Sequence, residues 1–459
     1  MPTQDMTEQA PPTVLADRYV LGRTLGRGGR ATVYEAEDRL LGRKVAVKLF
    51  HARAETAETL REQEAEAQVV ASLNHYALTT LFDAGVEASD AARPQLFLVM
   101  EHVPGTDLRA LLQAGPLAWT QVCQIGFDLA EGLQHLHGEG FVHRDVKPAN
   151  VLLAMREVGT RPRAKLTDFG IAALVGQPQL EEFVTGTAAY LSPEQVAGAD
   201  ATPASDVYSL GLVLIEALTG RVAFPGTIEE TAYARLVRDA AVPTDVPEAL
   251  QALLRSMTAR DPARRPAPVE IAAALQVALI DELVRQRGPE ARAPLEAEAA
   301  RLAALRRYDV LDTPPETAFD EVTRLAGRLL GAPIALISIV DTDRVWLKSR
   351  VGYEADVVDR NTSFCVVTNP GETAWAIPDA LLDPRTASNP VVVGDPKVRS
   401  YAAAPLTTRD GYRLGSLCVY DLEPREFDDE ALETLTELAG VVMDELELRL
   451  ASRRAASRR

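Results

Sequence analysis

The sequence predicts an α+β fold class, with strands gathered in two separate regions and helices between and after them. From Tyr19 to Leu49 the pattern is strand-like around a glycine turn, which is typical of an antiparallel sheet. From Leu117 onward helical patterns dominate. A second set of apolar strands follows Pro315. At 459 residues the chain is long enough for two or three domains.

The first region combines a small β-rich lobe with a larger helical lobe. Strands are predicted at 20–22, 32–36, 45–49 and 96–100, and the Glu-, Ala- and Gln-rich run at 55–73 predicts a helix beside them. In the larger lobe, helices are predicted at 119–137, 206–219, 229–238, 247–258 and 267–284.

Shifts in composition divide the chain into five segments. The polar N-terminal run contains Pro11-Pro12 and predicts a disordered leader. Gly288-Pro289 interrupts a helical pattern and predicts a linker. The predicted segments are the leader 1–16, a first domain 17–284, the linker 285–296, a second domain 297–450 and a basic tail 451–459.

The second domain is predicted to hold an antiparallel sheet flanked by helices. Apolar strands are expected at 334–340, 345–349 and 413–420. Helices at 295–308 and 429–450 each carry one apolar stripe. We expect these two helices to pack against each other, and a homodimer seam is the alternative.

Composition excludes several classes of protein. The net charge of −18, without a long basic block, argues against nucleic-acid binding. Three cysteines exclude a disulfide framework and favour a reducing compartment. The N-terminus does not resemble a secretory signal, and no apolar run reaches the length of a membrane span. We therefore expect a cytoplasmic protein.

One short string, His143-Arg144-Asp145-Val146-Lys147-Pro148-Ala149-Asn150, carries the strongest chemical signal. It places a base at Asp145, a cation at Lys147 and an amide at Asn150 on one loop. A second carboxylate, Asp168, follows in Asp-Phe-Gly. Asp145 is suited to accept a proton, Lys147 to neutralise a phosphate, and Asn150 and Asp168 to hold a metal ion. Together they predict a magnesium–phosphate site.

A glycine turn and a strand-borne lysine add the phosphate-binding side. Glycines allow backbone N–H groups to approach phosphate oxygens closely. Lys48 ends a Val-Ala-Val-Lys strand, and we choose Glu66 from the next helix as its acidic partner. The residues of the turn are Leu25, Gly26, Arg27, Gly28, Gly29, Arg30, Ala31, Thr32 and Val33.

These strings, in this order, make residues 17–283 resemble a bacterial serine/threonine protein kinase of the eukaryotic (Hanks) type. Lys147, two residues after Asp145, is the feature typical of serine/threonine rather than tyrosine kinases. The matching motifs are the glycine loop, Val-Ala-Val-Lys48, His143-Arg144-Asp145, Asn150, Asp168-Phe169-Gly170, Ser192-Pro193-Glu194, Asp206 and Arg265.

The resemblance implies how a nucleotide is bound. The adenine of ATP is expected against the backbone of Glu101 and Val103, after Met100, while glycine-loop amides cover its phosphates. Lys48, fixed by Glu66, is expected on the α- and β-phosphates. The implied metal ion is Mg²⁺, with Mn²⁺ as the alternative, and the implied substrates are protein serine and threonine hydroxyls. Supporting roles are implied for the ion pair of Glu194 with Arg265 and for Asp206 below the catalytic loop.

Two residues of the glycine loop differ from the family pattern, and two threonines are expected to have a regulatory role. Ala31 replaces the third glycine of the loop, and Arg30 stands where an aromatic residue or methionine is common. Thr187 is expected to contact the catalytic aspartate, and Thr185 is the expected autophosphorylation site, with Arg144 as the phosphate receptor. In an alternative, the acidic pair at 181–182 supplies the negative charge that Arg144 binds, and no phosphorylation is needed for basal activity. The simpler interpretation is that this pair is exposed to solvent.

Residues 297–450 carry a second set of motifs, which include Leu311-Asp312-Thr313-Pro314-Pro315, Pro333-Ile334-Ala335-Leu336-Ile337-Ser338, Ser363-Phe364-Cys365 and Gly415-Ser416-Leu417-Cys418. Through these motifs the segment resembles a GAF domain, a small-ligand or protein-interaction sensor module. The ligand stays open, because such modules bind cyclic nucleotides, tetrapyrroles, other small molecules or nothing. Cys365 is a candidate chromophore or redox site, although a buried apolar role for Cys365 and Cys418 is the simpler interpretation. Arg360, Asn361 and Asp379 are unranked pocket candidates.

Three functions are therefore weighed. The first is an ATP-dependent serine/threonine protein kinase regulated by its GAF domain. The second is a pseudokinase scaffold, which the presence of Lys48, Asp145, Asn150 and Asp168 opposes. The third makes the GAF domain a docking module for substrates.

Overall fold

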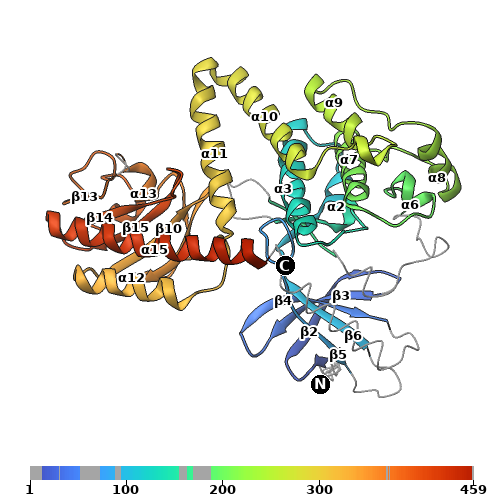
Figure 1. The fold of residues 1–459 in the computed structure, drawn as a ribbon. Helices are drawn as coiled ribbons and strands as arrows, with labels where there is room; N and C mark the ends of the chain where they lie inside the picture. The colour runs from blue at the N-terminus through green and yellow to red at the C-terminus, as the bar shows by residue number, and fades with distance from the viewer. Residues whose placement is uncertain are drawn as a thin grey trace, which may run out of the picture. The chain divides into compact units, whose positions relative to one another are not determined.

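The computed structural model of the chain describes residues 13–29, 31–51, 73–87, 95–154, 163–168, 188–368, 371 and 373–456. Its contacts divide the chain into two compact units, Met1–Leu279 and Ile280–Arg459, each of which is described by itself (Figure 1). Both units combine helices with antiparallel sheets, which confirms the predicted α+β class.

The first unit begins with a six-stranded antiparallel sheet in the order β1-β2-β3-β4-β6-β5. Its strands alternate their side chains between two faces. Val45, Val47 and Val99 belong to a small apolar cluster on one face, whereas Leu98 and Met100 join the main core of the unit. The strands are β1 (Val14–Leu15), β2 (Tyr19–Arg27), β3 (Ala31–Asp38), β4 (Arg43–Phe50), β5 (Leu81–Glu87) and β6 (Gln95–Glu101).

Helices make up most of the rest of this unit, as predicted. A three-stranded sheet, β7 (Gly105–Asp107), β8 (Val151–Ala154) and β9 (Arg163–Leu166), lies beside the helices and carries the loops of interest at its strand ends. The helices are α2 (Leu108–Leu112), α3 (Trp119–Gly138), α6 (Pro193–Val196), α7 (Pro203–Thr219), α8 (Ile228–Val237), α9 (Glu248–Met257) and α10 (Pro268–Arg287), with short 3-10 turns η1 (Pro148–Asn150) and η3 (Pro262–Arg264).

Close helix packing explains one glycine of this core. A Cβ added at Gly126 of α3 would lie 2.9 Å from Leu275 Cδ1 and 3.0 Å from Leu214 Cδ1. Both contacts are shorter than ordinary van der Waals separations, so a larger residue here would require the Leu275 and Leu214 side chains to move.

The second unit is built on a six-stranded antiparallel sheet in the order β12-β11-β10-β15-β14-β13. Its strands are β10 (Ile334–Val340), β11 (Arg344–Val351), β12 (Val357–Asp359), β13 (Trp375–Ile377), β14 (Ser400–Thr407) and β15 (Arg413–Asp421). Its helices are α11 (Arg292–Tyr308), α12 (Thr317–Leu329), α13 (Phe364–Val367), α14 (Pro390–Val393) and α15 (Asp429–Ala456), with the 3-10 turn η4 (Pro289–Ala291) before α11.

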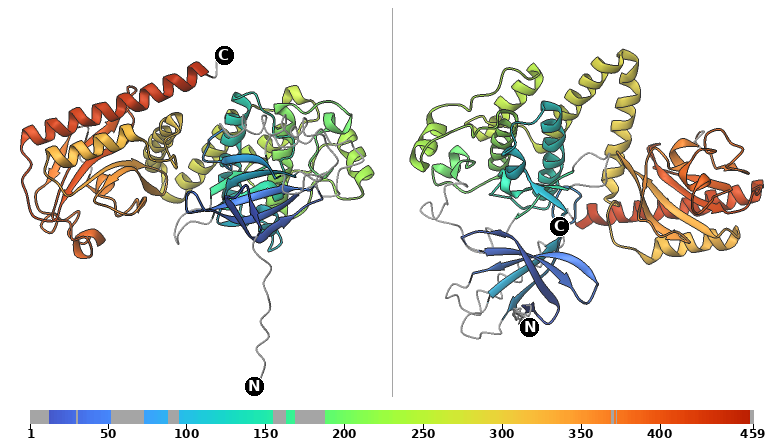
Figure 2. Two further views of the ribbon diagram at one scale, coloured as in Figure 1. Left: turned by 90° about the horizontal axis from the view of Figure 1, so that it is seen from below. Right: turned by 180° about the vertical axis from the view of Figure 1, so that it is seen from behind.

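The two faces of this sheet have different partners. Ile337 and Ile339 pack in a core with α11, α12 and α15, and Figure 2 shows α12 and α15 on the same side of the sheet. Leu336, between them in sequence, belongs to a separate core on the other face. The period of two residues along β10 therefore separates a helix-covered face from a face available for a pocket.

The two amphipathic helices at the ends of this unit share one core. Leu305 of α11 and Leu446 of α15 are both buried in it, and Tyr308 Oη donates a hydrogen bond of 2.8 Å to Glu447 Oε1. The predicted packing of these helices within one chain is confirmed. The predicted helix break lies at Gly288, where a φ of 102° and the following proline end α10. Most of the segment predicted as a linker, 285–296, is helical.

Candidate functional site

The loop between α3 and β8 brings three of the predicted residues together. Lys147 Nζ lies 2.7 Å from Asp145 Oδ2. Asn150 Nδ2 donates to Asp145 O at 2.8 Å and to Asp145 Oδ2 at 3.0 Å. Arg144, at φ 71°, turns the chain so that these short-range contacts form. The Asp145 carboxylate is thus held by a cation and an amide from its own loop.

Asp206, at the start of α7, supports this loop from a buried position. Its two carboxylate oxygens accept hydrogen bonds of 2.8 Å from the backbone amides of His143 and Arg144. His137, in the last turn of α3, lies 2.8 Å from Asp206 Oδ2. Burial lowers the pKa of His143 although the Asp206 and Asp145 carboxylates oppose this, so His143 stays neutral.

Asp168 follows β9 and lies next to Lys48. Its backbone φ of 66° is in the left-handed region, and its Oδ2 is 2.8 Å from Lys48 Nζ of β4. Burial opposes ionisation of Asp168, but the charge and hydrogen bond of Lys48 outweigh it, and the pKa of Asp168 is lowered. The ring of His143 bonds Thr167 O at 3.0 Å, and this joins the segment before Asp168 to the loop of Asp145.

The glycine turn connects β2 to β3, beside the strand that carries Lys48. Gly28 N donates to Ala31 O at 2.9 Å and closes the turn. A Cβ added at Gly26 or Gly29 would meet no described atom within 4 Å, so packing inside the described chain does not require glycine there. His51 contacts the turn and the start of β3, with Nδ1 3.2 Å from Gly29 O and Nε2 3.0 Å from Thr32 Oγ1.

The segment predicted to receive adenine follows β6. Glu101 ends that strand, and its backbone amide donates to Thr80 O at 2.8 Å. Its side chain binds Lys165 of β9, with Nζ 2.8 Å from Oε2. Val103 lies two residues further on, before β7. Lys165 therefore joins the end of β6 to the strand that precedes Asp168.

Four predicted site residues, Arg30, Glu66, Thr185 and Thr187, lie outside the described residues. The acidic pair at 181–182 and the Phe169-Gly170 part of the motif lie outside them as well. The remaining turn residues Leu25, Arg27 and Val33 are placed on β2 and β3, where Arg27 pairs with Thr32 and Gly26 with Val33.

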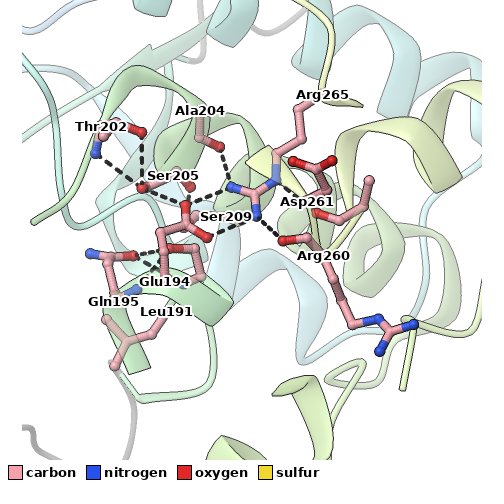
Figure 3. Close-up of polar contacts among 12 residues, drawn as sticks. Leu191, Glu194, Gln195, Thr202, Ala204, Ser205, Ser209, Arg260, Asp261 and Arg265 are labelled. Carbon is pink, nitrogen blue, oxygen red and sulfur yellow. Dashed lines mark hydrogen bonds and ion pairs between the residues drawn. The ribbon is translucent and has the colours of Figure 1, made fainter. Parts of the chain in front are cut away.

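Glu194 and Arg265 form a bidentate ion pair deep in the helical part of the first unit (Figure 3). Arg265 Nη1 and Nη2 lie 2.7 and 2.8 Å from the two Glu194 oxygens, and Arg265 also donates to the carbonyl oxygens of Ala204, Ala259 and Arg260. Burial opposes ionisation of Glu194, but hydrogen bonds from Arg265 and Ser205 outweigh it and lower its pKa to about 2.

The second unit carries a pocket on the face of its sheet opposite the long helices. Residues of β10, β11, β12 and β15 line it, together with side chains from 362–364 and 391–398. It encloses about 460 Å³ of empty space when the open solvent at its mouth is counted. Arg360, Asn361 and Asp379 are not among the described residues that line it.

Cys365 and Cys418 are free and buried near this pocket. Burial raises the pKa of both thiols, that of Cys418 to about 12, so both are neutral thiols at physiological pH. A neutral thiol is a poor nucleophile and a poor metal ligand. The geometry therefore favours the apolar role for both cysteines over the chromophore or redox role.

Three contact residues of the first unit were missed by sequence reasoning. His137, His51 and Lys165 each reach a partner through tertiary packing, and the pattern of the sequence does not single them out. For His137 a usable signal exists, because a histidine in the last turn of the helix before the Asp145 loop is close to that loop.

Two kinds of feature are lacking from the described residues. None of the described helices is long and apolar enough to cross a membrane. The described part of the chain contains no group of three or more His, Cys, Asp or Glu side chains arranged to hold a metal ion.

Comparison with known proteins agrees with the two units. Residues 19–277 match the protein kinase domain family, and residues 314–446 match the GAF domain family. The serine/threonine-protein kinase PknL of Mycobacterium tuberculosis is 39% identical over 316 residues, which cover 66% of this chain and 75% of PknL.

Two further relatives from Mycobacterium tuberculosis match a shorter part of the chain. The serine/threonine-protein kinase PknA is 36% identical over 257 residues, covering 55% of this chain and 58% of PknA. The serine/threonine-protein kinase PknB is 38% identical over 262 residues, covering 56% of this chain and 41% of PknB.

Proposed function

Because the chain belongs to the serine/threonine protein kinase family, we propose that Asp145 accepts the proton of a protein serine or threonine hydroxyl as that oxygen attacks the γ-phosphorus of ATP. The observation that carries this proposal is the convergence of Lys147 and Asn150 on Asp145 Oδ2, at 2.7 and 3.0 Å. In this arrangement Lys147 is poised to neutralise the γ-phosphoryl oxygens while Asp145 orients the hydroxyl.

The family uses ATP with a divalent metal ion, and we propose Mg²⁺ at Asn150 and Asp168. Asn150 directs its amide nitrogen to Asp145, which leaves its amide oxygen for a hard cation. Asp168 is held ionised by Lys48 and supplies a carboxylate oxygen. When bound, the ion neutralises charge on the phosphate oxygens.

The remaining nucleotide contacts are proposed from the same arrangement. Lys48 changes from its contact with Asp168 to a contact with the α- and β-phosphates, and the glycine turn covers the phosphates where Gly26 and Gly29 leave open space. The backbone of Glu101 and Val103 receives adenine. Glu66 as the partner of Lys48, and Thr185 and Thr187 as regulatory positions, enter this proposal on the sequence alone.

A transfer assay on the full chain tests the assignment of Asp145. With radiolabelled ATP, Asp145→Asn is expected to lower the rate by about a hundredfold or more, the typical contribution of a positioned base. Asp245→Asn makes the same chemical change at an exposed loop position and is expected to keep the wild-type rate. An Asp145→Asn enzyme as fast as the wild type would remove the assignment and would favour a scaffold role.

We also propose that the GAF domain regulates the kinase through α11. This helix follows α10 of the kinase domain after η4. Arg301 of α11 donates to Val340 O at 2.7 Å, and Glu298 of α11 lies 2.8 Å from Arg360 Nη1. Arg360 also donates to the carbonyl oxygens of Asp341 and Thr342. Because Arg360 contacts both the segment at 341–342 and Glu298, a movement of the segment around 360 would also displace α11.

The pair of variants Arg360→Gln and Arg350→Gln tests this link. Arg360→Gln breaks the contact with Glu298 and is expected to change the transfer rate of the full chain by about twofold or more. Arg350→Gln removes a surface ion pair with Asp356 on the same domain and is expected to leave the rate unchanged. Equal rates for wild type and both variants would remove this route of control.

The free, buried state of all three cysteines favours a reducing compartment, and we propose a cytoplasmic location.

A further inference from the structure

The pocket of the second unit has apolar walls. Its lining includes Ile334, Leu336, Leu347 and Val398, all of which are buried, and the aromatic ring of Phe364. These side chains belong to one apolar cluster, separate from the core that faces α11, α12 and α15. An apolar occupant would therefore gain free energy mainly by moving its own surface out of water.

Charged side chains are lacking from the described lining of this pocket. The cationic neighbours of lining residues in the sequence have other surroundings. Lys348, next to Leu347, binds Glu316, and Arg399, next to Val398, lies 2.8 Å from Asp379. Lys397 is exposed to solvent.

Hydroxyl groups supply the polar side chains of the lining. They belong to Ser338, Tyr353, Thr362, Ser363 and Tyr420. Several already have partners inside the protein, since Ser338 Oγ lies 3.0 Å from Ser416 Oγ and Ser363 Oγ lies 3.1 Å from Cys365 Sγ. A hydroxyl both donates and accepts, so these groups can bind a carbonyl or hydroxyl of an occupant without providing net charge.

We propose that this pocket binds an uncharged, largely apolar small molecule that carries at most a few hydroxyl or carbonyl groups. The inference rests on the proposed sensor role of the GAF domain and names the class of its ligand. Bringing an unpaired phosphate or carboxylate into such a site costs several kcal/mol because the described walls offer no cation to compensate it. Among the ligand classes considered, the same argument disfavours cyclic nucleotides, which carry a phosphate, and tetrapyrroles, which carry propionate carboxylates.

Two dyes with one ring system test the charge of the ligand. N-phenylnaphthylamine is uncharged, whereas anilinonaphthalene sulfonate adds a sulfonate to the same rings. Titrated into the full chain and followed by fluorescence, the uncharged dye is expected to bind saturably and at least about tenfold more tightly than the sulfonate, because the sulfonate would be buried without a partner.

Tryptophan substitutions test whether the uncharged dye binds in this pocket. Val358→Trp and Val391→Trp each fill a partly buried lining position on a different element, and both are expected to weaken binding of the uncharged dye by about tenfold or more through overpacking. Val441→Trp, at a 51% exposed position of α15, is the matched control and is expected to leave it unchanged. Near-ultraviolet circular dichroism shows that each variant is folded.

Each outcome decides the proposal. Equal affinity for the two dyes, no saturable binding of the uncharged dye, or binding that survives both pocket substitutions overturns it. The measurement is independent of phosphoryl transfer, since the Asp145→Asn chain is expected to bind the dye like the wild type. A dye that binds but leaves the transfer rate unchanged would therefore contradict the proposed regulation and support the ligand class.

Discussion

Replacing Arg265 by methionine is expected to destabilise the kinase domain by about 3 kcal/mol. The Arg265 side chain is fully buried, and that of Glu194 is 15% exposed, so the pair is well shielded from water. The lowering of the Glu194 pKa from 4.5 to about 2 corresponds to about 3 kcal/mol, at about 1.4 kcal/mol per pKa unit. Removal of one partner of a buried pair typically costs about 3–5 kcal/mol, which agrees.

The pH dependence of this contribution has a definite sign. The pKa of Glu194 is lower in the folded than in the unfolded chain, so the stabilisation is present in full above about pH 4.5. It is lost as the pH falls from about 4.5 toward about 2. The difference in stability between wild type and Arg265→Met is therefore expected to shrink over this interval.

Hydrogen exchange of the α7 amides measures this effect, because a chain of two units has no single free energy of unfolding. The matched control is Arg260→Met, which breaks the ion pair with Asp239, 48% and 71% exposed, and is expected to cost less than about 1 kcal/mol. If Arg265→Met and Arg260→Met opened α7 equally, the reasoning from burial would be refuted.

Three shorter predictions concern other groups of the chain. Lys48→Met is expected to lower the phosphoryl-transfer rate by about a hundredfold or more, whereas Lys44→Met, which removes an exposed cation of the same strand, should leave it unchanged; steady-state kinetics decides. Because burial lowers the pKa of His143, the wild type should lose stability relative to His143→Leu as the pH falls below about 6.5, as hydrogen exchange of the α7 amides at stepped pH would show. Cys418 should resist a thiol reagent at neutral pH until the chain is unfolded, and labelling of the native chain would contradict its burial.

Much of the fold follows from local periodicity. The helical pattern at 119–137 corresponds to α3, and the apolar run at 334–340 coincides with β10. Such patterns arise because each face of an element has to match its surroundings every two or 3.6 residues, which is a property of neighbouring positions. The boundaries were less exact, since α7 begins at Pro203, ahead of the predicted position 206.

The candidate catalytic residues could be named from the sequence because a single loop holds them. Asp145, Lys147 and Asn150 lie within six positions, so their mutual contacts need little more than the turn at Arg144. The contacts that support the loop could not be named as completely. His137 and Asp206 are separated by 69 positions and meet only because α3 packs on α7.

The sequence by itself determined the class of fold, the two families and the string of residues to which phosphoryl transfer is assigned in our proposal, because these are encoded in short-range patterns. Only the tertiary structure decided which side chains hold that string in place, that Lys48 meets Asp168, and that one face of the second sheet leaves a pocket whose described lining carries no charged side chain. The physical reason is that burial, and with it the strength of each charge and hydrogen bond, depends on elements that are distant in the chain and adjacent only after packing.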